Sequence, residues 1–203
     1  MDSAMAEVLD EYHDLIRAER ADRDEQSRAP RDRSSLHLAV GPQTGQLINI
    51  LAASLPAPRI LELGTSFGYS TLWLADAARS AGGRILTMEL VPEKSARAAM
   101  MIGRAGLSEF VDFRVGDARE LIAKVSGPVD FVLMDLWKDL YVPCLDLIHP
   151  RLAPGAVVVA DNMLRPGGPL MQQYADAIRA KGDMESILVP VGTGLEISRF
   201  KPG

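Results

Sequence analysis

Short apolar runs recur along this chain, and the segment between each two of them is long enough for one helix. Runs such as 131–134 and 156–160 are apolar throughout, which is typical of parallel strands that are buried on both faces. Strands that alternate with helices predict right-handed crossovers and a doubly wound, mostly parallel α/β sheet. The expected strands are 59–63, 84–88, 111–115, 129–134 and 155–160, and the expected helices are about 68–81, 92–105, 118–125, 138–152 and 168–181.

The C-terminal part departs from this alternation. Two further strand-like runs, 185–189 and 195–200, are separated by a glycine-rich turn. Two strands around such a turn predict a hairpin, and with it an antiparallel edge strand.

The N-terminal part is expected to be helical. Apolar residues at helical spacing predict a helix over about 5–23, and Pro42 opens a second helix that reaches about residue 54. Charges of both signs crowd between the two helices, which favours a solvated linker, with a lid over residues 24–35 as the alternative. We therefore expect one domain, in which an N-terminal helix and a charged linker or lid (1–35) precede the core (36–203).

Length and charge exclude several classes of protein. The 203 residues suit one domain, and a hydrophobic fraction of 47% is ordinary for a globular protein. A net charge of −5 gives no reason to expect nucleic-acid binding, which usually calls for a basic face. No segment has the length to span a membrane, and the acidic N-terminus lacks the apolar region of a signal peptide. We expect a cytoplasmic protein without nucleic-acid or membrane partners.

The first expected strand runs into a turn that contains Gly64 and Gly68. Glycines there allow close approach of the backbone to a ligand, although packing alone also explains them. Glu89 ends the second strand, where a carboxylate can accept hydrogen bonds from both hydroxyls of a ribose. The spacing is neither the G-x-G-x-x-G of a dinucleotide site nor a P-loop, so a nucleoside without a pyrophosphate fits best. Asp117 and Ala118 could line an adenine, although an Asp there is as often a helix N-cap.

Polar side chains follow the fourth and fifth expected strands. Asp135 comes after 129–134, and Asp161 and Asn162 come after 155–160. Ligands of parallel sheets bind at the carboxyl ends of the strands, and neighbouring strands lie only about 4.8 Å apart, so these side chains could share one cation. Each Asp alone is better explained as a helix cap or a surface residue. Together with the amide they form an all-oxygen set that favours Mg²⁺, Mn²⁺ or Ca²⁺.

Lys138 follows Asp135 by three positions. A lysine beside a cation in a partly buried cleft can give up its proton at usable pH, which an arginine cannot do, so Lys138 is a candidate general base. The simpler alternative is a lysine that points into solvent from the first turn of a helix. A helix N-terminus does not favour a cation, which mildly supports the functional alternative.

These residues together resemble the cation-dependent O-methyltransferases of the class I S-adenosylmethionine (SAM) superfamily, the family of catechol and caffeoyl-CoA O-methyltransferases. The resemblance covers about 38–200. It implies a Rossmann-like methyltransferase fold, with seven strands and an antiparallel last hairpin, in agreement with the expected strands. It rests on E-L-G-T-S-F-G-Y-S at 62–70, Glu89, G-D-A at 116–118, D-L-W-K-D-L-Y at 135–141 and D-N at 161–162.

The resemblance also implies ligands and roles. The ligands are SAM, a divalent cation (Mg²⁺ before Mn²⁺ or Ca²⁺) and a small catechol-type acceptor, whose attacking hydroxyl would lose its proton to Lys138. Trp137 would border the acceptor, although a tryptophan here could equally belong to the core. Relatives are often dimers, and the first helix is a candidate contact. The cation would be held by Asp135, Asp161 and Asn162, and SAM would be surrounded by Val40, Glu62, Gly64, Thr65, Ser70, Glu89, Asp117, Ala118 and Asp135.

One departure from the family concerns the acceptor. The catechol enzyme has a carboxylate on a late strand that holds the second hydroxyl. The matching region here, 185–188, aligns ambiguously: one alignment puts Ile187 at that place, with Glu185 two positions away on the same face of the strand. This puts the orientation of the acceptor, and hence the choice of hydroxyl, in doubt.

Three alternatives compete with the methyltransferase interpretation. A nicotinamide-dependent oxidoreductase is disfavoured because G-x-G-x-x-G and a Tyr-x-x-x-Lys relay are missing. An N-methyltransferase usually carries Asn/Asp-Pro-Pro-aromatic where this chain has D-L-W-K. A SAM-binding regulatory protein without turnover would need neither the metal ligands nor Lys138.

Overall fold

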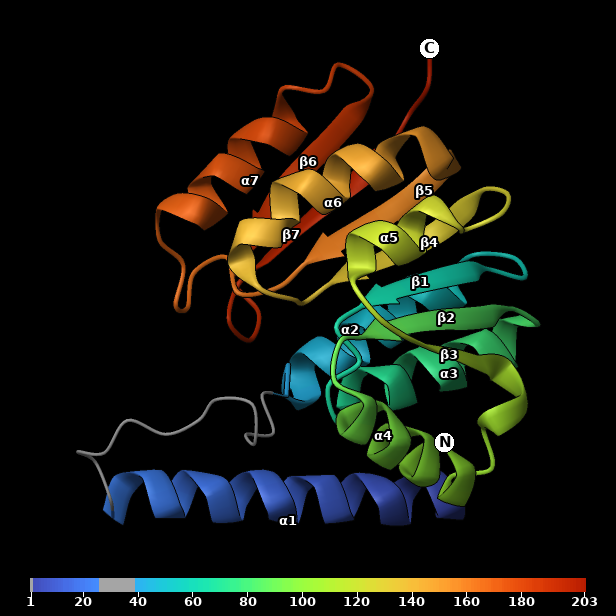
Figure 1. The fold of residues 1–203 in the computed structure, drawn as a ribbon, viewed down its shortest axis with the longest axis vertical. Coiled ribbons are helices and arrows are strands. Elements are labelled where there is room, and N and C mark those ends of the chain that lie inside the picture. The colour runs from blue at the N-terminus through green and yellow to red at the C-terminus, as the bar shows by residue number, and fades with distance from the viewer. Residues whose placement is uncertain (1, 26–38) are drawn as a thin grey trace.

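The structure is a computed structural model that describes residues 2–25 and 39–203. One seven-stranded sheet has the order β3-β2-β1-β4-β5-β7-β6 (Figure 1). Its strands are β1 (Arg59–Leu63), β2 (Arg84–Glu89), β3 (Val111–Val115), β4 (Val129–Met134), β5 (Leu152–Ala160), β6 (Met184–Val189) and β7 (Leu195–Phe200). The helices are α1 (Ser3–Glu25), α2 (Pro42–Ala53), α3 (Tyr69–Ala81), α4 (Pro92–Arg104), α5 (Ala118–Ala123), α6 (Tyr141–Ile148) and α7 (Pro169–Arg179), with short 3₁₀ turns η2 (Ser108–Phe110), η3 (Lys138–Leu140) and η4 (His149–Arg151).

The pairing of the strands confirms the doubly wound sheet. β1 pairs in parallel with β2 and β4, β2 pairs in parallel with β3, and β4 pairs in parallel with β5. The C-terminal hairpin is antiparallel, as expected, but the expectation of an antiparallel edge strand is wrong. β7 lies antiparallel between β5 and β6, and the edge strand β6 therefore runs in the same direction as the parallel strands.

The expected helix over 138–152 is the other correction. It divides into η3, α6 and η4, and β5 already begins at Leu152. Pro143 is tolerated in the first turn of α6, whereas Pro150 follows its end and cannot donate the hydrogen bond that a continued helix would need.

Helices cover both faces of the sheet (Figure 1). The side chains of β4 show why, since its alternate residues enter two separate hydrophobic clusters. Phe131 and Leu133 pack with residues of α1 to α4, and Val132 and Met134 pack with residues of α5 to α7. Burial on both faces explains the unbroken apolar run that the sequence shows there. Among the helices that the structure describes, none is long and apolar enough to cross a membrane.

The N-terminal helix α1 packs on the rest of the chain through an apolar stripe. Met5, Val8, Leu9 and Tyr12 are buried in the cluster that covers the α2–α4 face of the sheet. Residues 24 and 25 end α1, and the other residues of the predicted linker or lid, 26–35, lie outside the described residues. The predicted lid and the predicted dimer contact therefore stay predictions.

The strand order reverses between β1 and β4, which divides the sheet into two halves. In open α/β sheets this reversal opens a crevice at the carboxyl ends of the two strands. Asp135, which follows β4, donates its backbone N–H to the carbonyl of Leu63 at the end of β1, at 2.9 Å. The residues predicted to bind ligands lie around this point.

Candidate functional site

The turn after β1 is held tightly against the neighbouring strands. Gly64 and Thr65 both donate backbone N–H groups to the carbonyl of Met88, at 3.0 and 3.1 Å. Gly64 has a φ of +101°, and a Cβ atom there would lie well inside van der Waals contact with the carbonyl of Asp135. A side chain at this position would therefore separate the end of β1 from the end of β4, which explains why the predicted ligand turn needs this glycine.

Glu62 lies fully buried in β1 and faces this turn. Its Oε2 accepts hydrogen bonds from the hydroxyls of Thr71 and Thr87, both at 2.6 Å. Thr65 adds a third hydroxyl, 2.5 Å from that of Thr87. Burial raises the pKa of Glu62 from its ordinary 4.5 to about 7. Its Oε1 is buried and has no hydrogen-bond partner among the described residues.

Glu89, the last residue of β2, is tied to the same turn. Its carboxylate accepts hydrogen bonds from the backbone N–H groups of Ser66, at 2.8 Å, and Val91, at 3.0 Å. Ser66 has a φ of +48° and a buried hydroxyl that lacks a partner within the described part of the chain. The predicted ribose acceptor and the predicted methionine turn are therefore one connected structure.

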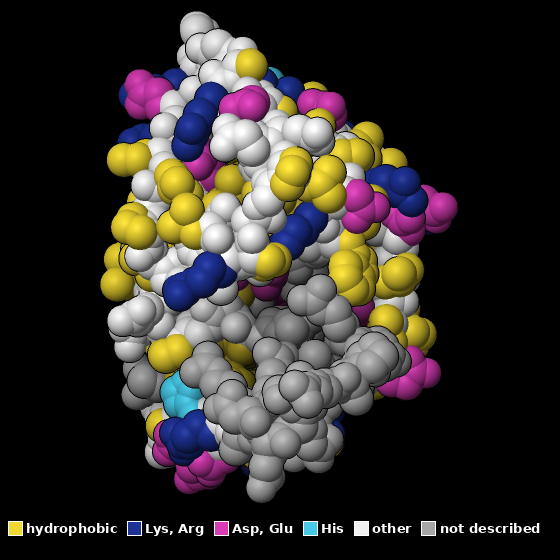
Figure 2. Space-filling model, turned by 90° about the vertical axis from the view of Figure 1, so that its left-hand side faces the viewer, with side chains coloured by type: hydrophobic (Ala, Val, Ile, Leu, Met, Phe, Trp, Pro, Cys, Tyr) yellow, Lys and Arg dark blue, Asp and Glu magenta, His cyan; other side chains and the backbone are white. Residues whose placement is uncertain are grey.

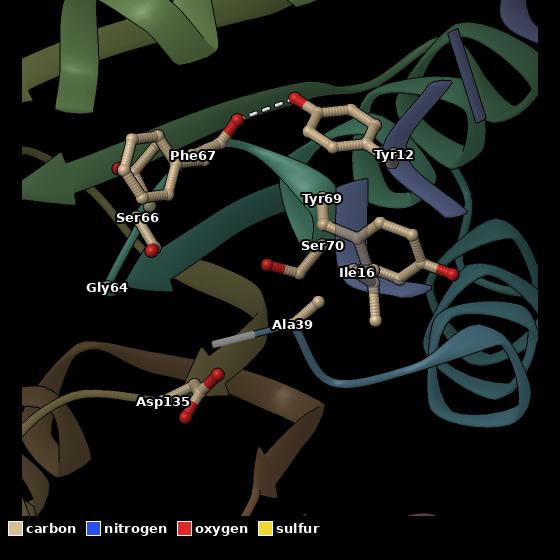
Figure 3. Close-up of a pocket in the computed structure, with 10 residues that line it drawn as sticks. Tyr12, Ile16, Ala39, Gly64, Ser66, Phe67, Tyr69, Ser70 and Asp135 are labelled. Carbon is tan, nitrogen blue, oxygen red and sulfur yellow. Dashed lines mark hydrogen bonds between the residues drawn. The ribbon is translucent and has the colours of Figure 1, made fainter. Parts of the chain in front are cut away.

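A cavity lies between this turn and α1 (Figure 3). Gly64, Ser70 and Asp135 line it from the side of the sheet, and Tyr12 and Ile16 of α1 line it from the other side. The Tyr12 hydroxyl donates a hydrogen bond of 2.5 Å to the carbonyl of Phe67. The sequence pattern predicted α1 as a helix but gave no sign that it forms a wall of the cavity. Further lining residues that sequence reasoning missed are Ala39, Ser66, Phe67 and Tyr69.

Three of the residues predicted to bind the cofactor, Asp117, Ala118 and Val40, do not line this cavity. Asp117 is the N-cap of α5: its side chain accepts from the backbone N–H of Arg119 at 2.8 Å and pairs with the guanidinium of the same residue. Those hydrogen bonds lower the pKa of Asp117 to about 2. Ala118 begins α5 behind this cap, and Val40 is buried beside α2. Contacts of these residues with a cofactor stay predictions.

The three predicted metal ligands do come together, at the ends of β4 and β5. Asn162 donates its side-chain Nδ2 to Asp135 Oδ1 at 2.7 Å. Asp161 donates its backbone N–H to Met134 at 3.0 Å, and its carbonyl accepts from the Tyr141 hydroxyl at 3.2 Å. Figure 2 views the molecule from the side toward which the parallel strands point and shows an acidic side chain in a recess there.

Burial and repulsion make this acidic pair unfavourable in its ionised form. Burial and the facing Asp161 carboxylate raise the pKa of Asp135 well above its ordinary value, while the Lys138 ammonium acts in the opposite direction. Burial also raises the pKa of Asp161. A bound cation would reverse both shifts. The described residues contain no group of three or more His, Cys, Asp or Glu side chains that could hold a metal, so a cation would depend on the Asn162 amide as its third ligand.

The segment after Asp135 places the predicted base and a tryptophan beside this pair. Lys138 begins η3 and acts electrostatically on both Asp135 and Asp161. Trp137 is 58% exposed, so the interpretation that it belongs to the core is wrong. Of the two residues weighed for the missing acceptor carboxylate, Ile187 is 63% exposed and Glu185 pairs with Lys201 at 2.5 Å.

A second and larger cavity, about 340 Å³, contains none of the predicted site residues. It lies between α5 and the strands β1 to β3, and its lining runs from Arg59 and Arg84 at the start of β1 and β2 to Met88 near the end of β2. Its size alone does not make it the reaction site, because the carboxylates, the lysine and the glycine turn are all absent from its lining.

Comparisons with known proteins show which family the chain resembles. A family model described as a methyltransferase domain matches residues 61–163. The chain is 36% identical over 152 residues to a catechol O-methyltransferase of Mycobacterium tuberculosis, covering 73% of this chain and 68% of the relative. It is 34% identical over 142 residues to the catechol O-methyltransferase of Mus musculus, covering 66% of this chain and 53% of the relative.

Solved structures extend the likeness over the whole chain. An O-methyltransferase from Bacillus cereus, in complex with S-adenosylhomocysteine (SAH), has a TM-score of 0.79 at 25% identity and covers 99% of this chain and 92% of its own. An O-methyltransferase from Streptomyces achromogenes involved in tomaymycin synthesis, in complex with SAM, has a TM-score of 0.76 at 26% identity and covers 100% of this chain and 91% of its own.

Proposed function

This chain belongs to the SAM-dependent O-methyltransferase family, and from that premise we propose that it methylates one of two neighbouring hydroxyls of a catechol-like molecule with the help of a divalent cation. The observation that carries the proposal is the meeting of Asp135, Asp161 and Asn162 beside the charge of Lys138. The names of the curated relatives support a catechol-type acceptor.

The turn after β1 fits the cofactor of this family. Glu62 Oε1 and Ser66 Oγ are buried and lack hydrogen-bond partners within the described part of the chain, so polar groups of a ligand would satisfy them. SAM, when bound, supplies a methyl group on a positively charged sulfur. The residues that would hold it are Val40, Glu62, Gly64, Thr65, Ser70 and Asp135 around its methionine part, Glu89 at its ribose, and Asp117 and Ala118 at its adenine.

The ends of β4 and β5 fit a hard divalent cation. Two carboxylates and an amide are oxygen donors of the kind that Mg²⁺, Mn²⁺ and Ca²⁺ prefer, and Mg²⁺ is our first choice. Burial raises the pKa values of Asp135 and Asp161, and a bound cation would act in the opposite direction by favouring the charged carboxylates. Such a cation, when bound, lowers the pKa of a hydroxyl that it contacts.

Lys138 is the residue that would remove the proton from the acceptor. In its neutral form, Lys138 Nζ would accept the proton of the attacking hydroxyl. SAM, when bound, would supply the methyl group to that oxygen, and its sulfur would keep the electron pair of the broken carbon–sulfur bond. The products are the methyl ether and SAH. The work of the remaining residues is to hold the two reactants in line, which accounts for much of the rate of such transfers.

The test is methyl transfer from SAM to a matched set of acceptors. We expect turnover of catechol in the presence of Mg²⁺, loss of turnover in EDTA, and recovery when Mg²⁺ is added in excess. Phenol and 2-methoxyphenol, which lack a neighbouring pair of free hydroxyls, should not be methylated. Methylation of phenol at the rate of catechol, or full activity in EDTA, would overturn the proposal.

A further inference from the structure

The turn between β6 and β7 lies against the loop that carries the proposed metal ligands. Three backbone hydrogen bonds join the two: Met163 donates to Gly194 at 3.0 Å, and Leu164 and Arg165 both donate to Thr193 at 2.9 Å. Because the loop begins directly after Asn162, these bonds fix the turn relative to the ends of β4 and β5.

The side chain of Thr193 reaches the metal site itself. Its hydroxyl donates a hydrogen bond to Asp161 Oδ1. Only 2% of Asp161 is exposed, and its backbone is already held by Met134 and Tyr141. The hydrogen bond from Thr193 also holds Oδ1 of the Asp161 side chain, and it thereby restricts rotation of the carboxylate. A hydroxyl is neutral, so it orients the carboxylate without cancelling the negative charge that a cation needs.

The same turn also lies close to the first turn of α2 and to Val40, just before that helix. A Cβ atom on Gly192, whose φ is +59°, would overlap Thr44 Oγ1 and lie 3.4 Å from the carbonyl of Val40. The turn therefore fills the space between the start of α2 and the end of β5. Thr193 therefore reaches Asp161 from a turn that contacts both α2 and the loop after Asn162.

We infer that Thr193 is a positioning residue, whose hydroxyl orients the Asp161 carboxylate for the divalent cation. The inference rests on the proposed function, because it needs a cation at Asp135, Asp161 and Asn162. Residues that orient a metal ligand commonly affect metal affinity about 10–100-fold, although they do not touch the metal.

The experiment is a titration of the full chain with Mn²⁺ in the absence of SAM, with free Mn²⁺ followed by electron paramagnetic resonance. Thr193→Val removes the hydroxyl and keeps the shape, whereas Thr193→Ser keeps the hydroxyl. Thr44→Val is the matched control, since Thr44 contacts the same turn but its buried hydroxyl has no hydrogen-bond partner among the described residues. Thermal unfolding of each variant shows whether it is folded.

We expect Thr193→Val to raise the Kd for Mn²⁺ about tenfold. Thr193→Ser and Thr44→Val should stay close to the wild type, and the Kd for SAM in the absence of metal should not change. Wild-type affinity in Thr193→Val overturns the inference and leaves the proposed function standing. An equal loss in Thr193→Ser also overturns it, because packing of the methyl group would then be the cause. A wild-type protein that binds no Mn²⁺ overturns the metal part of the proposed function and the inference together.

Discussion

Asn162 Nδ2 donates to Asp135 Oδ1 at 2.7 Å, so a side chain that follows β5 is bonded to one that follows β4. The two residues are 27 positions apart in the sequence. Parallel pairing of β4 with β5 brings them together, and Met134 faces Ala160 in the last register position. The proposed metal ligands are thus assembled by the sheet itself.

Asn162 also has a left-handed backbone, with a φ of +67°. Asn162→Gly keeps this conformation without strain and removes the amide, whereas Asn162→Ala removes the amide and adds strain of about 1 kcal/mol. We expect both variants to lose Mg²⁺-dependent turnover to the same extent and only Asn162→Ala to lose additional stability in urea. Retention of turnover in Asn162→Gly would show that the amide is not a metal ligand.

Lys138 lends itself to a comparison of two substitutions. Lys138→Ala removes the proposed base, and Lys138→Arg keeps a positive charge that cannot release its proton. We expect both to lower kcat for catechol by about 10²–10⁴-fold while the Kd for SAM changes little. If Lys138→Arg turned over catechol at the wild-type rate, the residue would act only through its charge.

Glu62 makes stability depend on pH. Its pKa rises from 4.5 to about 7 in the folded protein, with the carboxylates of Glu89 and Asp135 nearby. Between these two pH values the folded protein keeps a proton that the unfolded chain has released. The contribution of this bound proton to the free energy of unfolding is fully present below pH 4.5 and is lost as the pH rises through 7. The shift corresponds to about 3 kcal/mol.

The corresponding variant is Glu62→Gln, which stays neutral at every pH. We expect its free energy of unfolding to fall less steeply than that of the wild type between pH 4.5 and 7, as measured by urea denaturation in EDTA. The exposed Glu120→Gln is the control and should follow the wild-type curve. Parallel curves for Glu62→Gln and the wild type would contradict the raised pKa.

Gly64 and Gly82 form a matched pair of left-handed glycines, with φ values of +101° and +72°. A Cβ atom on Gly64 would overlap the backbone of Asp135, whereas one on Gly82 would meet nothing within 4 Å. Gly82→Ala should cost about 1 kcal/mol from backbone strain alone. Gly64→Ala should cost more than about 2 kcal/mol and raise the Kd for SAM, since it also separates β1 from β4. Equal costs would mean that the overlap is relieved without movement of the strands.

Much of the fold follows from local patterns in the sequence. The bounds predicted for β1, β3, β4 and β7 agree with the structure because each strand is one apolar or strongly patterned run. The expected helix over 138–152 was too long because it contains two prolines with different effects. Pro143 is tolerated in the first turn of α6, whereas Pro150 marks the end of the helix. No local pattern distinguishes an edge strand from its neighbour. The sequence therefore could not predict that β7 lies next to β5 and that β6 forms the edge of the sheet.

Some residues of the proposed site could likewise be predicted from the sequence, and others could not. Asp135, Asp161 and Asn162 could be predicted to meet because strand ends carry them, and the structure brings them together. Tyr12 and Thr193 could not be predicted, because an interior helix position and a turn residue gain their roles only from contacts 55 and 32 positions away in sequence.

The place of β7 between β5 and β6 has a consequence for the order in which the protein assembles during its synthesis. The strands up to β5 can pair as they leave the ribosome, since each needs only partners made earlier. Thr193, by contrast, reaches Asp161 only after the last hairpin has emerged and inserted beside β5. At common elongation rates this hairpin is synthesised roughly 2–8 s after Asp161. During that time the acidic site of the nascent chain lacks Thr193, and β5 is an unpaired edge strand.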